Sequence, residues 1–121
     1  MKTSDLPTEA CARMLGHVPE NGFESDGLTG CPDTIGGVDC RAAGVFHDYA
    51  YTIGGTEDDR WVADRNFCIN LLLCGLPHQL ADVAYRRVRL WGISHFRYDA
   101  RPRGIWRCLL YVRCFFSRYW N

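Results

Sequence analysis

Two helical stretches separated by the dipeptide Gly54-Gly55 constrain this 121-residue chain most strongly. The first stretch covers about residues 38–53, and the two glycines end it. The second begins at Thr56, a residue type that caps helices, and the three acids that follow suit the positive end of its dipole. We expect it to continue to about Cys74, with Gly75 as its end. A connection this short predicts an antiparallel helix hairpin.

The hairpin brings His47 and Asp64 to nearly the same height. His47 lies about six residues before the turn, and Asp64 lies about eight residues after the second helix begins; each residue adds about 1.5 Å of rise. A carboxylate there can fix the tautomer of the imidazole and stabilise the cation formed when its other nitrogen accepts a proton. The spacing predicts an acid–base pair, with a buried structural pair between two helices as the alternative.

Asp48 points about 100° away from His47 around the first helix, so it is available to bind a cation. A glycine-rich segment upstream can present oxygen atoms to the same cation, from Asp26, Gly27 and Gly30. Oxygen ligands of this kind suit Ca²⁺. A plain turn at Asp26-Gly27 and a surface carboxylate at Asp48 are the alternatives.

A third helix is expected over about residues 77–91, because Pro77 fits its first turn. We expect Arg86, Arg87 and Arg89 on faces of this helix other than the apolar one. The apolar residues that recur at helical spacing are Leu80, Val83, Ala84, Val88 and Trp91.

Residues 1–37 contain frequent glycines and prolines, so we expect an irregular region with one short helix around Glu9–Leu15, capped by Thr8. The fold class predicted for residues 1–121 is a single all-α domain. Its helical core spans residues 38–92, and residues 93–121 form a basic, aromatic segment.

The string His47-Asp48-x-x-Tyr51 on one helix, with Asp64 on the next, resembles the active-site signature of the phospholipase A2 superfamily. The resemblance implies that His47 activates a water molecule, that Asp48 binds calcium and that Asp64 orients His47. Tyr51 resembles the tyrosine of the motif, and packing with one hydrogen bond is its alternative role. The activity implied is calcium-dependent hydrolysis of a phospholipid ester.

The wider pattern over residues 24–92 is similar to a family of small proteins encoded mainly by tailed bacteriophages and prophages. Its elements here are Asp26-Gly27-x-Thr29, Ala42-Ala43, His47-Asp48-x-x-Tyr51, Ala63-Asp64-x-x-Phe67 and Cys74-Gly75-Leu76. The resemblance implies synthesis in a bacterial cytoplasm and a place in the virion or its tail, with phage structural proteins as partners. A non-catalytic virion protein that keeps the helix pair as a scaffold is the alternative.

Charge and composition exclude several classes. Residues 1–82 carry 13 acids and 5 bases, whereas residues 83–121 carry 1 acid and 9 bases. No nucleic-acid-binding module accompanies the basic half, so we predict no nucleic-acid partner. The N-terminus lacks the apolar stretch of a signal peptide, and no apolar run reaches the roughly 18 residues of a membrane span. The odd number of cysteines, seven, argues against a secreted disulfide framework.

The segment 103–121 is strongly amphipathic if it is helical, although residues 109–116 also suit a strand. Its apolar face could complete the core, dock on a neighbouring subunit or lie on a phospholipid membrane surface.

Overall fold

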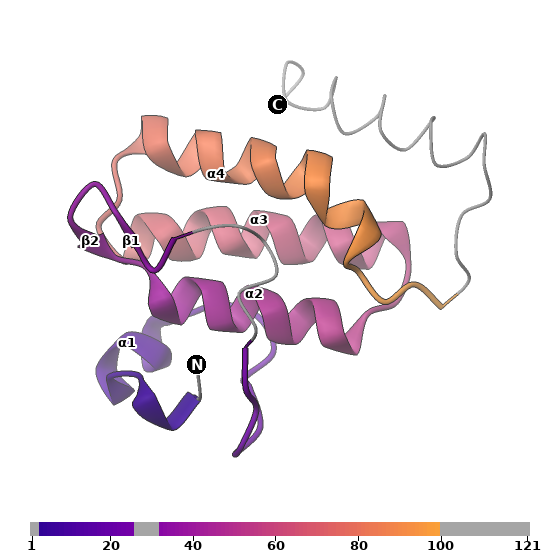
Figure 1. Cartoon of the computed structure of the whole chain (residues 1–121), viewed down its shortest axis with the longest axis horizontal. Helices are drawn as coiled ribbons and strands as arrows, with labels where there is room; N and C mark the ends of the chain where they lie inside the picture. Colours follow the sequence, from indigo (N-terminus) through magenta and orange to yellow (C-terminus); the bar gives the residue numbers. More distant parts are fainter. Residues whose placement is uncertain (1–2, 26–31, 100–121) are drawn as a thin grey trace.

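Three helices lie side by side, with α3 between α2 and α4 (Figure 1). The computed structural model describes residues 3–25 and 32–99. Most of the second range belongs to α2 (Arg41–Ile53), α3 (Glu57–Leu73) and α4 (His78–Trp91). No helix among the described residues is long and apolar enough to cross a membrane. The predicted amphipathic segment 103–121 lies outside the described residues.

The turn between α2 and α3 depends on glycine geometry and on a capping box. Gly54 and Gly55 have φ angles of 74° and 132°, a region that favours glycine. The backbone N–H of Thr56 donates to Asp59 Oδ2 at 2.8 Å, and the backbone N–H of Asp59 donates to Thr56 Oγ1 at 3.2 Å. Gly55 also donates to the carbonyl of Arg97 at 2.9 Å, so the chain after α4 closes over this turn. Helices α2 and α3 therefore form the predicted antiparallel hairpin.

Helix α3 ends in a Schellman motif at Gly75, whose φ angle is 101°. The N–H of Leu76 donates to the carbonyl of Leu71 at 3.1 Å, and that of Gly75 donates to Leu72 at 2.9 Å. Pro77 is the N-cap residue of α4. Both helix ends agree with the predicted ones to within one residue.

The region before α2 contains more regular structure than predicted. A short 3₁₀ helix, η1 (Thr3–Asp5), precedes α1 (Thr8–Arg13). The expected short helix is present, but Pro7 is its N-cap residue and Thr8 is already helical. This helix also ends two residues earlier than expected.

A small antiparallel sheet of β1 (Thr34–Ile35) and β2 (Val38–Asp39) corrects the all-α prediction. The reason is the connecting pair Gly36 and Gly37, with φ angles of 55° and 81°. A two-residue type I′ hairpin turn needs positive φ at both positions, and Gly-Gly supplies it. Helix α2 consequently begins at Arg41 and not at residue 38. The described fold is mostly helical with one two-stranded sheet.

The main core lies between α2, α3 and the inner face of α4. Phe46, Phe67, Leu71 and Val88 are among its residues, and each is at most 3% exposed. A smaller cluster beside the α2–α3 turn contains Tyr51, Ala63 and Phe96.

The buried face of α4 differs from the prediction. Leu80, Val83 and Trp91 belong to the expected apolar face but are 37%, 44% and 66% exposed. Arg89, expected away from the apolar face, is only 2% exposed. Its guanidinium is buried because carboxylates on α3, including that of Asp64, accept its hydrogen bonds.

Replacing Gly92 with alanine should destabilise the protein by about 1–3 kcal/mol, because a Cβ atom there would overlap the hydroxyl group of Tyr51. Gly44 provides a matched control within α2, since nothing lies within 4 Å of the position that a Cβ atom would take there. Gly44→Ala should instead stabilise the protein by about 0.5–1 kcal/mol. Urea denaturation of both variants checks this pair, and equal effects would contradict the packing argument.

Candidate functional site

His47 and Asp64 meet across the α2–α3 interface. His47 Nε2 lies 2.7 Å from Asp64 Oδ1, and both side chains have no exposed surface. The hydroxyl of Tyr51, one turn after His47, donates to the same carboxylate oxygen at 2.7 Å. The structure therefore brings together three residues that the sequence analysis placed in one site.

The orientation of the His47 ring follows from its neighbours. Its centroid lies 4.3 Å from that of Tyr51 and 4.5 Å from that of Phe67. Asp64 is an acceptor when ionised, so Nε2 carries the hydrogen and Nδ1 of the neutral ring carries the lone pair. Nδ1 is buried and has no hydrogen-bond partner among the described residues. The pair thus holds one imidazole nitrogen in place and leaves the other for chemistry.

Two arginines contact the second carboxylate oxygen of Asp64, whereas His47 Nε2 contacts the first. Arg89 Nη1 donates to Asp64 Oδ2 at 2.7 Å, and Arg60 Nη1 lies 3.4 Å from the same oxygen. Both guanidinium groups also donate to Glu57 Oε1 at 3.0 Å. Two carboxylates therefore compensate two cations in a network that is almost closed to solvent.

The pKa values of the site follow from this network. Burial raises the pKa of Asp64, but the hydrogen bond from His47 and the positive charges of Arg60 and Arg89 outweigh it, and the pKa ends below its ordinary value. Burial and the charge of Asp64 raise the pKa of Tyr51 well above its usual value. Asp64 is therefore an ionised acceptor and Tyr51 a neutral donor, which makes Tyr51 a positioning residue.

The network predicts a loss of stability in acid. Burial raises the pKa of Glu57. Hydrogen bonds from Arg60 and Tyr98 and the charges of both arginines outweigh this effect, so the pKa ends below its ordinary value of 4.5. The pKa of Asp64 is likewise below its ordinary 3.8. A carboxyl whose pKa is lower in the folded than in the unfolded state stabilises the folded state at pH values above its ordinary pKa. That stabilisation is lost as the pH falls through the lowered pKa of the folded state.

We therefore expect the free energy of unfolding to fall as the pH drops below about 4.5, the range set by these ordinary pKa values. Urea denaturation between pH 7 and pH 3 measures this. Glu57→Gln, which lacks one of the two titrating carboxyls, should show a shallower fall. An equal fall in both proteins would contradict the role of Glu57.

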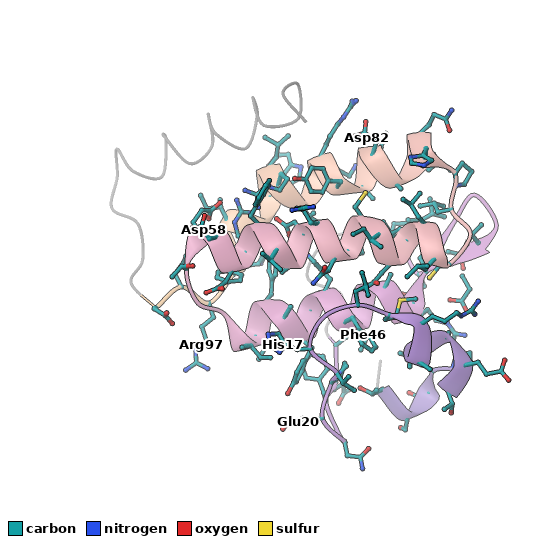
Figure 2. The ribbon with its side chains drawn as sticks, turned by 180° about the vertical axis from the view of Figure 1, so that it is seen from behind. His17, Glu20, Phe46, Asp58, Asp82 and Arg97 are labelled. Carbon is teal, nitrogen blue, oxygen red and sulfur yellow. The ribbon has the colours of Figure 1, made fainter. Side chains whose placement is uncertain are left out.

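A cleft of about 370 Å³ lies between α2, α3 and the segment after α1. His47 is one of its lining residues, together with His17 and Asn66. Figure 2 shows His17 beside Phe46, where the N-terminal segment crosses α2. A second hollow on α3 and α4 contains Trp61 and Arg65 but no acid–base pair. The first cleft is therefore the candidate site.

Asp48 is placed apart from this cleft. Its side chain is 3% exposed, and the hydroxyl of Ser25 donates to its Oδ2. Asp48 is not among the described residues that line the cleft. The other predicted calcium ligands, Asp26, Gly27 and Gly30, lie outside the described residues. The described residues contain no group of three His, Cys, Asp or Glu side chains placed to hold a metal ion.

Several site residues escaped the sequence analysis. Glu57 was interpreted only as an acid in the first turn of a helix, and Arg60 was not singled out. A usable signal exists in α3, because Glu57, Arg60 and Asp64 recur at i, i+3 and i+7 on one helix face. No sequence signal marks His17, because its place in the cleft follows from the path of the N-terminal segment.

Comparisons with protein-family models, curated proteins and solved structures found no match. The fold and the site define a small, mostly helical protein with a buried His–Asp–Tyr cluster beside a surface cleft. The resemblance to the phospholipase A2 superfamily and to phage proteins stays a prediction from the sequence.

Proposed function

We propose that this protein is a phospholipase A2-like ester hydrolase that acts on phospholipid with the help of calcium. One observation carries the proposal. His47 is bound through Nε2 to the ionised Asp64, and its unpartnered Nδ1 belongs to a residue that lines the cleft. This is the arrangement that a general base needs.

In the proposed reaction, Nδ1 of His47 takes a proton from a water molecule whose oxygen forms a bond to the ester carbonyl carbon. The tetrahedral intermediate collapses, the ester C–O bond breaks, and the proton passes from Nδ1 to the departing alkoxide. Asp64 stabilises the imidazolium between these steps. Tyr51 and Arg89 hold Asp64 in place through bonds of 2.7 Å each.

The rim of the cleft favours a lipid substrate over a small soluble ester. Leu15, Ile53 and Val62 line the cleft and are 43%, 44% and 51% exposed. Large apolar side chains gathered at one opening are suited to acyl chains or to a membrane surface.

The donor chemistry near Asp48 fits calcium. Asp48 Oδ2 accepts a hydrogen bond from the hydroxyl of Ser25, and carboxylate and hydroxyl oxygens are ligand types that Ca²⁺ prefers. Asp48 with oxygens of Asp26, Gly27 and Gly30 would hold the ion. When bound, calcium would supply positive charge for the oxyanion of the intermediate. Asp48 does not line the cleft, so this role of calcium is the step that the chelator experiment tests.

Purified protein incubated with vesicles of mixed zwitterionic and anionic phospholipid should release fatty acid in the presence of calcium. A chelator should stop the release, and added calcium should restore it. Mass spectrometry should find fatty acid and lysophospholipid in equal amounts, because hydrolysis of one ester bond releases one molecule of each. No release above the protein-free blank, with folded protein and calcium present, would refute the proposed activity.

A non-catalytic role in a phage virion or tail is the second candidate. The observation in its favour is the complete burial of the His47 and Asp64 side chains, which also suits a tie between two helices. Calorimetry without detectable calcium binding, together with mass spectrometry that finds the chain in purified particles, would favour this candidate over the hydrolase.

A further inference from the structure

Asn70 joins two parts of the chain that are far apart in sequence. Its side chain, on α3, is 1% exposed. The backbone N–H of Leu15 donates to Asn70 Oδ1 at 2.7 Å, and Asn70 Nδ2 donates to the carbonyl of Leu15 at 3.0 Å. One buried amide therefore satisfies both backbone groups of a single residue in the N-terminal segment.

The segment held in this way is a strap, defined here as Leu15–Val18. It lies between two buried residues, Met14 and Pro19, while its own four residues are exposed. Gly16 within it has a φ angle of 101°, a conformation that favours glycine. The two hydrogen bonds between Asn70 and Leu15 are the only side-chain hydrogen bonds to the strap among the described residues.

The strap and His47 line the same cleft. Leu15, Gly16 and His17 line it on one side, and His47 lines it from α2. The side chain of His47 has no exposed surface. The strap is therefore part of the wall of the cleft from which a molecule would reach Nδ1.

We infer that Asn70 is a positioning residue that latches the strap over His47 and so controls access to its Nδ1. The inference rests on the proposed function for its catalytic meaning, because His47 is the proposed base. The latch itself is independent of hydrolysis, so its test does not need turnover. Release of the latch requires that both bonds to Leu15 break, after which the glycine allows the strap to swing.

Diethyl pyrocarbonate, which modifies the unprotonated nitrogen of histidine, measures access directly. Peptide mapping by mass spectrometry separates His47 from the exposed His78 and His95, which serve as internal standards. In the wild-type chain His47 should react more slowly than both. Asn70→Ala should accelerate the reaction of His47 by roughly five- to hundredfold, as expected for the loss of two net hydrogen bonds, and leave the standards unchanged.

Asn21→Ala is the control, because Asn21 is the same residue type, is exposed and is not among the residues that line the cleft. It should leave the rate of His47 unchanged. Asn70→Asp, which still accepts from the Leu15 N–H but cannot donate to its carbonyl, should give an intermediate rate. Hydrogen exchange should show lost protection at the Leu15 amide in Asn70→Ala and retained protection in Asn21→Ala.

Three results would overturn the latch. The first is a His47 as reactive as His78 in the wild-type chain. The second is an unchanged His47 rate in Asn70→Ala when the Leu15 amide has lost its protection. The third is a faster modification of His47 in Asn70→Ala that is accompanied by an equal increase in hydrogen exchange of the core amides of α3. Such a result would indicate that the whole protein opens and not only the strap. Failure of the proposed hydrolysis would leave all these measurements interpretable, so the two ideas fail separately.

Discussion

Replacing His47 with glutamine should lower the rate of phospholipid hydrolysis by about 10²- to 10⁴-fold, the usual effect of removing a general base. In the wild-type chain His47 Nε2 lies 2.7 Å from Asp64 Oδ1. Glutamine is close in size to histidine and can still donate a hydrogen bond to Asp64, so the variant keeps a hydrogen bond between the two helices. It has no basic nitrogen, so it cannot accept a proton from water. The loss should appear mainly in kcat, because the apolar rim of the cleft is unchanged.

His78→Gln is the matched control for this experiment. His78 is exposed at the first turn of α4 and does not line the cleft. Its replacement should leave hydrolysis within about twofold of wild type, since surface substitutions away from a site have small effects. Equal activity of the His47→Gln and wild-type proteins would remove His47 from the mechanism and favour the structural role of the pair.

Replacing Arg60 with methionine should lower the free energy of unfolding by about 3–5 kcal/mol, the usual result of removing one partner from a buried ionic network. Arg60 is 0% exposed and donates to Glu57, to Asp64 and to the carbonyls of Val88 and Arg89. Methionine keeps most of the packing volume. It leaves Arg89 as the single arginine facing two buried carboxylates.

Arg86→Met provides the same chemical change at the surface of α4. Arg86 pairs with Asp82 at 2.6 Å, and the two side chains are 36% and 48% exposed. Exposed pairs of this kind contribute about 0–1 kcal/mol. Urea denaturation of both variants at pH 7 gives the comparison. Similar stabilities of the two variants would show that the buried network is not a major source of stability.

The network of Glu57, Arg60, Asp64 and Arg89 also fixes how α4 packs on α3. Buried carboxylates and guanidinium groups are costly unless every partner is present. Glu57 and Asp64 come from α3, whereas Arg89 comes from α4. The ion pairs therefore require α4 to dock in one register on α3. That requirement links the position of α4 to the orientation of His47 through Asp64.

Local signals were enough for the helix ends and for the central pair. Thr56 and Gly75 cap α3 as their residue types predict, because capping depends on groups within one turn of the chain. The meeting of His47 and Asp64 follows from helix rise once the Gly54-Gly55 turn is assumed. These features are predictable because a few neighbouring residues determine them. The Gly36-Gly37 hairpin belongs to the same class, and its signal was present but not used.

Tertiary structure decided the rest. The burial of Arg89 depends on carboxylates 25 and 32 residues earlier, and the latch at Asn70 depends on Leu15, 55 residues away. The spacing of residues on one helix does not indicate which charged side chain will form an ion pair with a side chain on another helix. Residue types at the helix ends and the length of the turn predict the three long helices and place His47 opposite Asp64, since both follow from local geometry. Only the packing of α4 and of the N-terminal segment decided which polar groups surround that pair, because such contacts exist only after distant segments have docked.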